Sequence, residues 1–209
     1  MKIIVDENDK HIQINDLYVE NLESFLSFWR DLQNKYAGYE IDFCYHNCEV
    51  PIEFMHDIGM TLLESCVETR LVQKNFAPVY MDCIEPTLVT LENFAAFSIL
   101  HDKTNPEMFW TSEKISKDLS RWRIYMYGDS YAMMSLWGDV SEIFALETLN
   151  SNESVGAVLL SEACKFAFET GKTGVLIMID DDSPVQVKTA KSVGFIECGK
   201  YAAYRGIIK

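Results

Sequence analysis

The pattern of apolar and polar positions is most regular in the C-terminal part of the chain. An extended segment at 140–147 runs into the polar loop 150–154, and an amphipathic helix follows over about 157–170 and ends before Gly171. The apolar run 174–179 then predicts a strand that is central in its sheet and buried on both faces. A strand, a polar loop and a helix start can bind an anion, because the first N–H groups of a helix lack intrahelical acceptors and carry partial positive charge, although most such junctions bind nothing.

Further helices and strands are predicted on both sides of this stretch. Apolar residues at helical spacing follow Asn93, and the hydroxyl and acidic residues at 111–113 are typical of a second helix start. Two aromatic-rich strands flank a turn at 128–130. Residues 85–209 therefore predict a strand at 85–91, helices from 94 and from 111, strands at 121–127, 131–137 and 140–147, a helix at 157–170, a strand at 174–179, a helix at 185–192 and a strand at 196–204.

This order resembles that of the GNAT superfamily of acetyl-CoA-dependent N-acetyltransferases, and the resemblance covers residues 85–209. The tripeptide 144–146, Phe-Ala-Leu, is similar to the family's Leu-Ala-Val on strand four, and Gly194-Phe195 matches a Gly-Phe pair near the family's C-terminus. The family's loop pattern, Arg/Gln-x-x-Gly-x-Gly/Ala, falls on residues 151–156, where only the last small residue is kept. The resemblance implies a mixed α/β fold of the GNAT-like acyl-CoA N-acyltransferase type.

The resemblance also implies acetyl-CoA as a co-substrate. The strand at 140–147 would part from its neighbour and offer its backbone to the pantetheine, and the following loop would hold the pyrophosphate. The cofactor-binding residues are therefore expected to be Ala145, Leu146, Ser151, Asn152, Glu153, Ser154, Val155, Gly156, Ala157 and, at the family's Asn position before helix four, Ser183.

The N-terminal part of the chain carries a shorter version of the same order. It predicts strands at about 11–17, 39–45 and 62–72, with helices at 21–35 and 51–58. The interval from Gly59 to Gly194 equals the interval from Lys74 to Lys209, and the spacing from Gly38 to Gly59 is close to that from Gly174 to Gly194. We interpret this as an internal, diverged repeat, although chance similarity between two α/β segments is the alternative.

The predicted domains are thus a degenerate half GNAT-like domain at 1–82 and a complete one at 83–209. The loop before the first helix, 16–20, has no glycine and two acids. Acids compete with a pyrophosphate for the helix dipole, so the front half is expected to be non-catalytic.

Composition restricts the partners. The net charge of −14 disfavours nucleic acid and anionic membranes and suits a cationic amine, although a charged surface for solubility is the preferred explanation. No run of 18 apolar residues is present, so no membrane span is expected. The N-terminus turns acidic too soon for a signal peptide, and the six cysteines show no framework spacing, so a cytoplasmic protein with reduced thiols is expected. Cys44, His46 and Cys48 lack a fourth ligand, so no metal site is predicted.

The resemblance implies acyl transfer, in which a base takes a proton from the acceptor's ammonium group so that the neutral amine attacks the thioester. Glu142 and Glu147 on the strand at 140–147 are the candidate bases. Period-two alternation places Glu142 on the face of Phe144 and Leu146, and Glu147 on the other face. Family members with a base on this strand carry it on the face of Glu142, so Glu142 is the preferred base; an ordinary half-exposed carboxylate is the alternative.

The general acid is harder to assign. The family's tyrosine falls on Ala190, which has no proton to give. Tyr201 is the candidate replacement, with Tyr204 beside it, although strand tyrosines are commonly packing residues, and an unassisted thiolate departure stays open. The acids at 180–182 either meet the acceptor or form a solvated loop, and His101 is interpreted as a helix-end residue. Three tryptophans either line an acceptor pocket or pack in the core: Trp110, Trp122 and Trp137.

Two functions remain open from the sequence. The first is an N-acetyltransferase that acts on the amine of a small molecule or peptide, which the complete order of elements and the small residues at 156–157 favour. The second is a GNAT-fold binding module without turnover, which the departures at Ser151, Ser154 and Ala190 favour.

Overall fold

The computed structural model describes residues 2–15, 21–46, 52–106 and 108–209. The loop expected at 16–20 and the cysteine at 48 lie outside these ranges. The chain forms two compact units. Unit 1 is Met1–Val67 together with Gly199–Lys209, and unit 2 is Glu68–Cys198.

Unit 1 is a mixed sheet with two helices. Its strand order is β1-β2-β3-β10-β4, in which β2 and β3 are parallel and β10 is antiparallel to β3. Strand β1 was not predicted; it forms an antiparallel hairpin with β2. The elements are β1 (Lys2–Asp6), β2 (His11–Asn15), α1 (Leu22–Tyr36), β3 (Glu40–His46), α2 (Ile52–Asp57), and the parts of β4 (Thr61–Leu71) and β10 (Ile196–Ile207) that fall in this unit.

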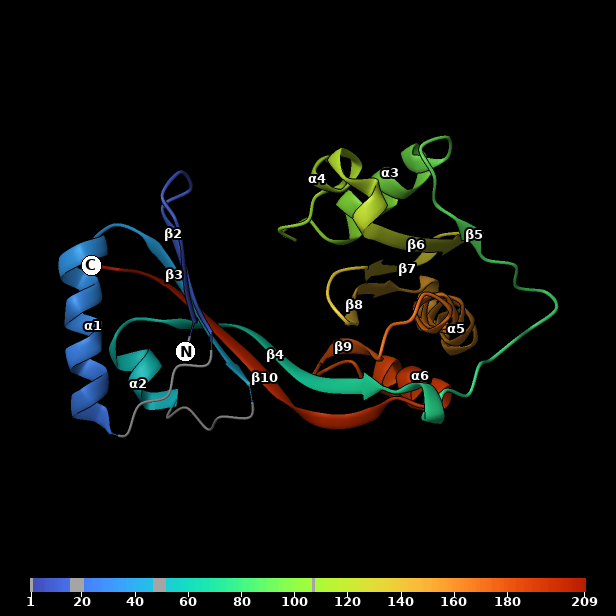
Figure 1. The fold of residues 1–209 in the computed structure, drawn as a ribbon. Coiled ribbons are helices and arrows are strands. Elements are labelled where there is room, and N and C mark those ends of the chain that lie inside the picture. The colour runs from blue at the N-terminus through green and yellow to red at the C-terminus, as the bar shows by residue number, and fades with distance from the viewer. Residues whose placement is uncertain (1, 16–20, 47–51, 107) are drawn as a thin grey trace. The chain divides into compact units, whose positions relative to one another are not determined.

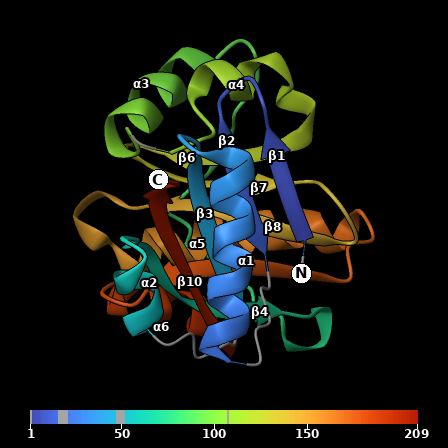
Figure 2. The ribbon, with the colours of Figure 1, turned by 90° about the vertical axis from the view of Figure 1, so that its left-hand side faces the viewer.

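The helices of unit 1 are held by an aromatic core. Helix α1 lies across the strands (Figure 2) and buries Phe25 and Trp29, whose rings each lie 6.1 Å from that of Phe43 on β3. Met55 of α2 joins the same cluster. The helical spacing of the apolar residues in α1 and the alternation of apolar residues along β2 and β3 therefore explain why these side chains meet in one core.

Unit 2 is a sheet with helices on both faces. Its strand order is β10-β4-β9-β8-β7-β6-β5, where β8 and β9 are parallel and β5 to β8 form an antiparallel series. Its further elements are β5 (Thr87–Leu88), α3 (Phe94–Thr104), α4 (Ser112–Lys117), β6 (Trp122–Tyr127), β7 (Ser130–Ser135), β8 (Val140–Glu147), α5 (Glu153–Glu169), β9 (Gly174–Asp180) and α6 (Pro184–Val193), with short 3₁₀ turns at Gln73–Asn75, Leu119–Arg121 and Leu149–Ser151.

Two apolar clusters separate the faces of this second sheet. Helices α3 and α4 pack on one face through Phe97 and Ile115, whereas α5 and α6 pack on the other (Figure 1). On β9, the side chains of one face are fully buried and those of the other, Leu176 and Met178, are half-buried. The strand is interior in the sheet as predicted, but only one of its faces is completely covered.

The order of elements predicted for residues 11–209 is confirmed, and the order strand, helix, strand, helix, strand occurs in both halves of the chain. One pair of equivalent glycines differs from the pair predicted. Gly38 follows α1 and Gly171 follows α5, and both have φ of +84°, so Gly38 corresponds to Gly171 rather than to Gly174. A left-handed residue at this place ends a helix, and glycine adopts it without steric cost. The separation in sequence between equivalent residues changes along the repeat, in part because α1 has 15 residues and α5 has 17.

The last strands of the two repeats are exchanged. In unit 1, β3 pairs with β10 rather than with β4, the last strand of its own repeat, and in unit 2, β9 has β4 as its neighbour. The compact units therefore differ from the predicted division at residues 82 and 83, since β4 and β10 each contribute to both. Among the described residues, no helix is both long and apolar enough to cross a bilayer.

Candidate active site

Strand β8 separates from β9 part of the way along its length. The parallel ladder runs from the Val140–Gly174 pair to the Ile143–Ile177 pair, so β8 continues for four residues beyond it. On its other side β8 stays paired with β7, but a bulge falls at Phe144, because Met134 lies opposite Ile143 and Met133 opposite Ala145. An extra residue bends and twists a strand and commonly re-aims side chains next to a functional site. The expected parting at 144–147 is thus present.

The bulge also changes the face on which the acids lie. Ile143 and Leu146 both belong to the cluster beneath α5, three residues apart, whereas Ala145 belongs to the cluster beneath α3 and α4. Glu142 precedes Ile143 and Glu147 follows Leu146, so both acids lie on the α3–α4 face. The prediction that they occupy opposite faces was wrong, since simple alternation cannot be carried across a bulge.

Glu147 lies in a more enclosed place than its position on a strand suggested. It is half-buried and lies opposite Tyr131 of β7. Burial raises the pKa of its carboxyl group above the ordinary value, the negative charge of Asp180 adds to that rise, and the nearby Asn105 side chain opposes it. Glu142, opposite Ser135, is also half-buried and has interactions of its own.

Hydrogen bonds connect Asn105, Tyr131 and His101, and Tyr131 lies opposite Glu147. The Asn105 amide nitrogen lies 2.7 Å from the Tyr131 hydroxyl, which lies 2.8 Å from Nδ1 of His101, and Nε2 of His101 lies 2.7 Å from the carbonyl oxygen of Trp110. His101 and Tyr131 are completely buried. His101 lies in the last turn of α3 but is buried and is therefore not an exposed base; it anchors Tyr131 inside the apolar cluster of α3 and β7.

The loop after β8 leads into the N-terminus of α5, as predicted. Asn150 and Ser151 have φ near +54° and +53°, a conformation that Asn tolerates better than most residues. Asn152 is the N-cap: its side chain accepts a hydrogen bond from the N–H of Val155 and its carbonyl from that of Gly156. The N–H groups of Glu153 and Ser154 lie in the first turn of α5, where backbone N–H groups lack intrahelical acceptors and can bind an anion.

Gly156 has a packing role in this helix start. A Cβ atom there would lie 3.0 Å from Cγ2 of Thr189 and 3.1 Å from Cγ2 of Thr148. The glycine thus allows α6 and the end of β8 to approach α5 closely, and neighbouring Ala157 is buried in the same cluster. Replacing Gly156 would disturb packing as well as any phosphate, so it is a poor probe of cofactor binding.

Helix α6 adds two residues that the sequence did not single out. The Lys188 ammonium lies 2.7 Å from the Glu153 carboxylate, so the acid in the loop has a cation beside it. The Gln186 side chain donates to the carbonyl oxygen of Leu146 at 3.0 Å, which ties α6 to β8 beyond its last pair with β9. Ser183 is the residue before α6, and its N–H donates to the carbonyl of Asp180. Ala190 is fully buried between α5 and α6.

Tyr201 lies on β10 within unit 1, whereas Glu142 and Glu147 belong to unit 2. Its hydroxyl and the thiol of Cys44 share a hydrogen bond, and burial raises the pKa of the phenol above its ordinary value. Tyr204 is a packing residue, with its ring 6.3 Å from that of Tyr45 in the unit 1 core. Both tyrosines therefore belong to unit 1, whereas the candidate bases belong to unit 2.

The three tryptophans form one cluster on the α3–α4 face. The ring of Trp110 lies 5.2 Å from that of Trp122 and 5.8 Å from that of Trp137, and Trp122 also contacts Phe144. Trp122 is buried, whereas Trp137 is 44% exposed. The cluster thus reaches the bulge of β8 through Trp122, and only part of the cluster is core.

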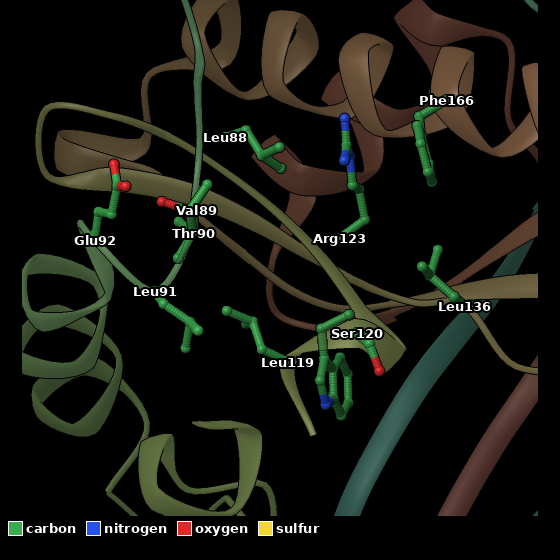
Figure 3. A pocket seen from close by; sticks show the side chains of 11 residues that line it. Leu88, Val89, Thr90, Leu91, Glu92, Leu119, Ser120, Arg123, Leu136 and Phe166 are labelled. Carbon is green, nitrogen blue, oxygen red and sulfur yellow. The ribbon is translucent and has the colours of Figure 1, made fainter. Parts of the chain in front are cut away.

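A separate groove of about 690 Å³ lies at the β5–β6 edge of unit 2 (Figure 3). Trp122 lines it, but neither of the candidate bases Glu142 and Glu147 does. Arg123 points into it, with its guanidinium carbon 3.9 Å from the ring centre of Phe166. Leu88 and Leu136 complete its apolar wall. The cation is held by aromatic contacts, so the groove explains nothing of the acyl-transfer chemistry.

Comparison with known proteins gives the fold a name. No family model matches the chain, and no curated protein matches it. Solved structures do match. A GCN5-related N-acetyltransferase from Sphaerobacter thermophilus superposes with a TM-score of 0.68 at 12% identity, covering 99% of this chain and 76% of that one. The chain has the GNAT fold.

Two further structures agree with this assignment. An acetyltransferase of the GNAT family from Colwellia psychrerythraea matches with a TM-score of 0.64 at 12% identity, covering 97% of this chain and 80% of that one. A tandem GNAT protein from the clavulanic acid biosynthesis pathway matches with a TM-score of 0.62 at 8% identity, covering 99% and 78%. The likeness to a tandem protein is consistent with the repeat in this chain.

Sequence reasoning found the strand, the loop and both acids, but missed the residues that surround them. These residues are remote from Glu147 along the chain: Asn105, Tyr131, Gln186 and Lys188. One signal was accessible: the turn at 128–130 fixes the β6–β7 hairpin, and continuing the antiparallel series places Tyr131 across from the end of β8. No comparable signal pointed to Asn105, which follows the last residue of α3.

Proposed function

We propose that the chain transfers an acetyl group from acetyl-CoA to the amine of a small molecule or peptide. The observation that carries the proposal is the end of β8: the strand leaves its partner β9, a half-buried acid stands at its last residue, and a helix N-terminus follows after one short loop. These are the three parts that acyl transfer from a CoA thioester requires, namely a backbone slot, a base and a phosphate site.

The pantetheine would lie along 144–147 of β8, and the pyrophosphate over 151–157. Two N–H groups, of Glu153 and Ser154, point from the helix start where the dipole favours negative charge. Lys188 lies beside the Glu153 carboxylate and would offset its repulsion of the phosphates. The missing loop arginine of the family thus has a partial substitute on α6.

We assign the base to Glu147 rather than Glu142. Burial raises the pKa of the Glu147 carboxyl group, which brings it nearer to the pH at which a base is effective. The carboxylate would take a proton from the acceptor's ammonium group, the amine would attack the thioester carbon, and the tetrahedral intermediate would collapse with departure of the CoA thiolate. Ala190, at the family's tyrosine position, is buried and has no proton to give, so the thiolate would take its proton from solvent.

A thermal-shift experiment tests the cofactor first. Acetyl-CoA or CoA at 100 times its dissociation constant should stabilise the protein by about 2.7 kcal/mol, whereas adenosine alone should not. Acetyl transfer is then measured on a panel of small amines and peptides with free thiol as the product. Stabilisation without transfer to any amine would support the alternative function, a GNAT-fold binding module, which the buried Ala190 at the family's tyrosine position favours.

A further inference from the structure

The groove at the β5–β6 edge of unit 2 exists because β5 is short. Strand β5 pairs with two of the six residues of β6, whereas β7 pairs with all six. Asn93 then turns the chain aside: its side-chain oxygen accepts from the N–H of Thr90, and its side-chain nitrogen donates to the carbonyl of Leu88 at 3.0 Å. Trp122 and Arg123, at the start of β6, therefore lie beyond the end of β5 and line an open groove (Figure 3).

The walls of this groove are mainly apolar and come from unit 2 alone. Its volume of about 690 Å³ is typical of sites for small molecules, which combine apolar walls with a few polar groups that orient the ligand. Two charged side chains line it, Arg123 and Glu92. The apolar lining residues are Leu88, Val89, Leu91, Leu119, Trp122, Leu136 and Phe166.

Arg123 is the cation of the groove, and aromatic contacts hold its guanidinium group. The guanidinium carbon lies 3.9 Å from the ring centre of Phe166 and 5.1 Å from that of Tyr125, and Nε donates to the Tyr125 hydroxyl at 3.0 Å. Within the described ranges of the chain, Arg123 forms no ion pair with a carboxylate. The terminal nitrogens of a positioned guanidinium group are thus left for a ligand.

The chemistry of the groove selects one kind of ligand. A guanidinium fork matches a carboxylate, which accepts two parallel hydrogen bonds from it. A carboxylate would also compensate the charge of the half-buried Arg123, which stands among apolar side chains. Glu92 lines the groove apart from Arg123 (Figure 3) and would repel a second negative group on the ligand. The ligand is therefore expected to carry a single carboxylate on an apolar body.

We propose that this groove binds a small organic acid, with its carboxylate paired to Arg123 and an aromatic or aliphatic body against Leu88, Leu136 and Phe166. Neither β8 nor the start of α5 lines the groove, so the proposal is independent of acetyl transfer. A protein C-terminus carries the same carboxylate, but the size of the groove favours a free small molecule.

The first test is a titration of the full-length protein with naphthoate, followed by calorimetry and by NMR of the backbone amides. Binding should saturate, with the largest shifts at the amides of 88–92 and 119–123. Naphthylmethanol has the same ring without the charge and should bind at least about tenfold more weakly. Shifts confined to other segments, or equal affinity for the acid and the alcohol, would overturn the proposal.

The second test removes the cation. Arg123→Gln should weaken naphthoate binding at least about tenfold, and Arg123→Lys, which keeps the charge but loses the fork, should weaken it less. Arg30→Gln, at an exposed position of α1, removes the same charge elsewhere and is the matched control, with unchanged affinity. Wild-type affinity in folded Arg123→Gln contradicts the assignment.

An exposed lining residue provides a second pair of variants. Ser120→Glu adds a carboxylate that competes for Arg123 and should weaken naphthoate binding about tenfold, whereas Ser120→Gln, of similar size, should bind as the wild type does. If Arg123→Gln does not fold, equal affinity in these two variants overturns the proposal. A peptide that ends in leucine with a free carboxylate and binds more tightly than naphthoate would assign the groove to a protein C-terminus and overturn the choice of a small acid.

Discussion

The two repeats of this chain differ most at the strand pair that ends in the loop before the long helix. In unit 1, β2 pairs with β3 along its whole length, from the His11–Glu40 pair to the Asn15–Cys44 pair. In unit 2, the equivalent ladder of β8 and β9 covers only half of β8. A closed ladder satisfies its backbone groups internally, whereas a parted one leaves groups for another molecule. The same order of elements thus produces a filled sheet in one unit and a slot in the other.

The starts of the two long helices show a second difference. Both begin with an asparagine N-cap that accepts from the N–H three residues on, Asn21 in α1 and Asn152 in α5. Four residues after each cap, α1 carries Phe25, buried in the unit 1 core, and α5 carries Gly156, against which two threonines pack. Identical capping therefore accompanies different packing, and capping alone does not mark a binding site.

The largest expected effect concerns Gly59 and Gly194, the two glycines that occupy matching places in the repeat. Both have positive φ, but a Cβ at Gly59 meets nothing within 4 Å, whereas one at Gly194 would lie 2.0 Å from the carbonyl oxygen of Asn75. Gly194→Ala should lower the free energy of unfolding by about 2–5 kcal/mol, the sum of left-handed strain and overpacking. Gly59→Ala should cost about 1–2 kcal/mol from strain alone. Urea unfolding measures both; equal losses would show that the close approach at Gly194 can relax.

The next effect tests whether the parted strand is catalytic. Glu147→Gln keeps the size of the side chain but cannot accept a proton, so acetyl transfer near neutral pH should fall on the order of 10²-fold or more while CoA binding is kept. The loss should shrink at high pH, where the amine deprotonates without help. Glu142→Gln on the same face is the control and should retain most activity. If instead Glu142→Gln is inactive and Glu147→Gln keeps its activity, Glu142 is the base, as the sequence analysis preferred.

The activity of the wild type should also depend on pH in a defined way. Since burial and Asp180 raise the pKa of Glu147, the base is protonated at a higher pH than an ordinary glutamate. The rate with saturating substrates should therefore fall as pH decreases through that raised pKa, and Asp180→Asn should extend activity to lower pH. If the pH dependence of the rate is the same in Asp180→Asn as in the wild type, Glu147 does not titrate in the measured step.

The smallest expected effect concerns charge at the second helix start. Ser154 is exposed on α5, and the matching residue of α1 is Glu23. Ser154→Glu should weaken CoA binding about tenfold, roughly 1.4 kcal/mol, because a second acid then competes for the helix dipole. Ser154→Gln has similar size without charge and should bind nearly as the wild type does. Equal affinity in both variants would place the pyrophosphate away from this loop.

The order of helices and strands could be predicted from the sequence alone, because each element carries its own periodicity, cap or turn. The strand, loop and helix start of the candidate site were also located this way, since their residues are contiguous. Even the repeat followed, because equivalent glycines end equivalent elements. Strand β1 was not predicted, because its five residues show no alternation of burial and four of them are exposed.

Strand pairing and the face that each acid occupies depend instead on tertiary contacts. The exchange of β4 and β10 follows from contacts between distant segments, and both strands have similar patterns when taken alone. The bulge at Phe144 depends on the register between β7 and β8, and it turns Glu147 toward α3. Asn105, Tyr131 and His101 meet because α3 packs on that same face. Local patterns fix elements through short-range sterics, whereas a base acquires its environment from side chains that only packing brings within hydrogen-bond distance.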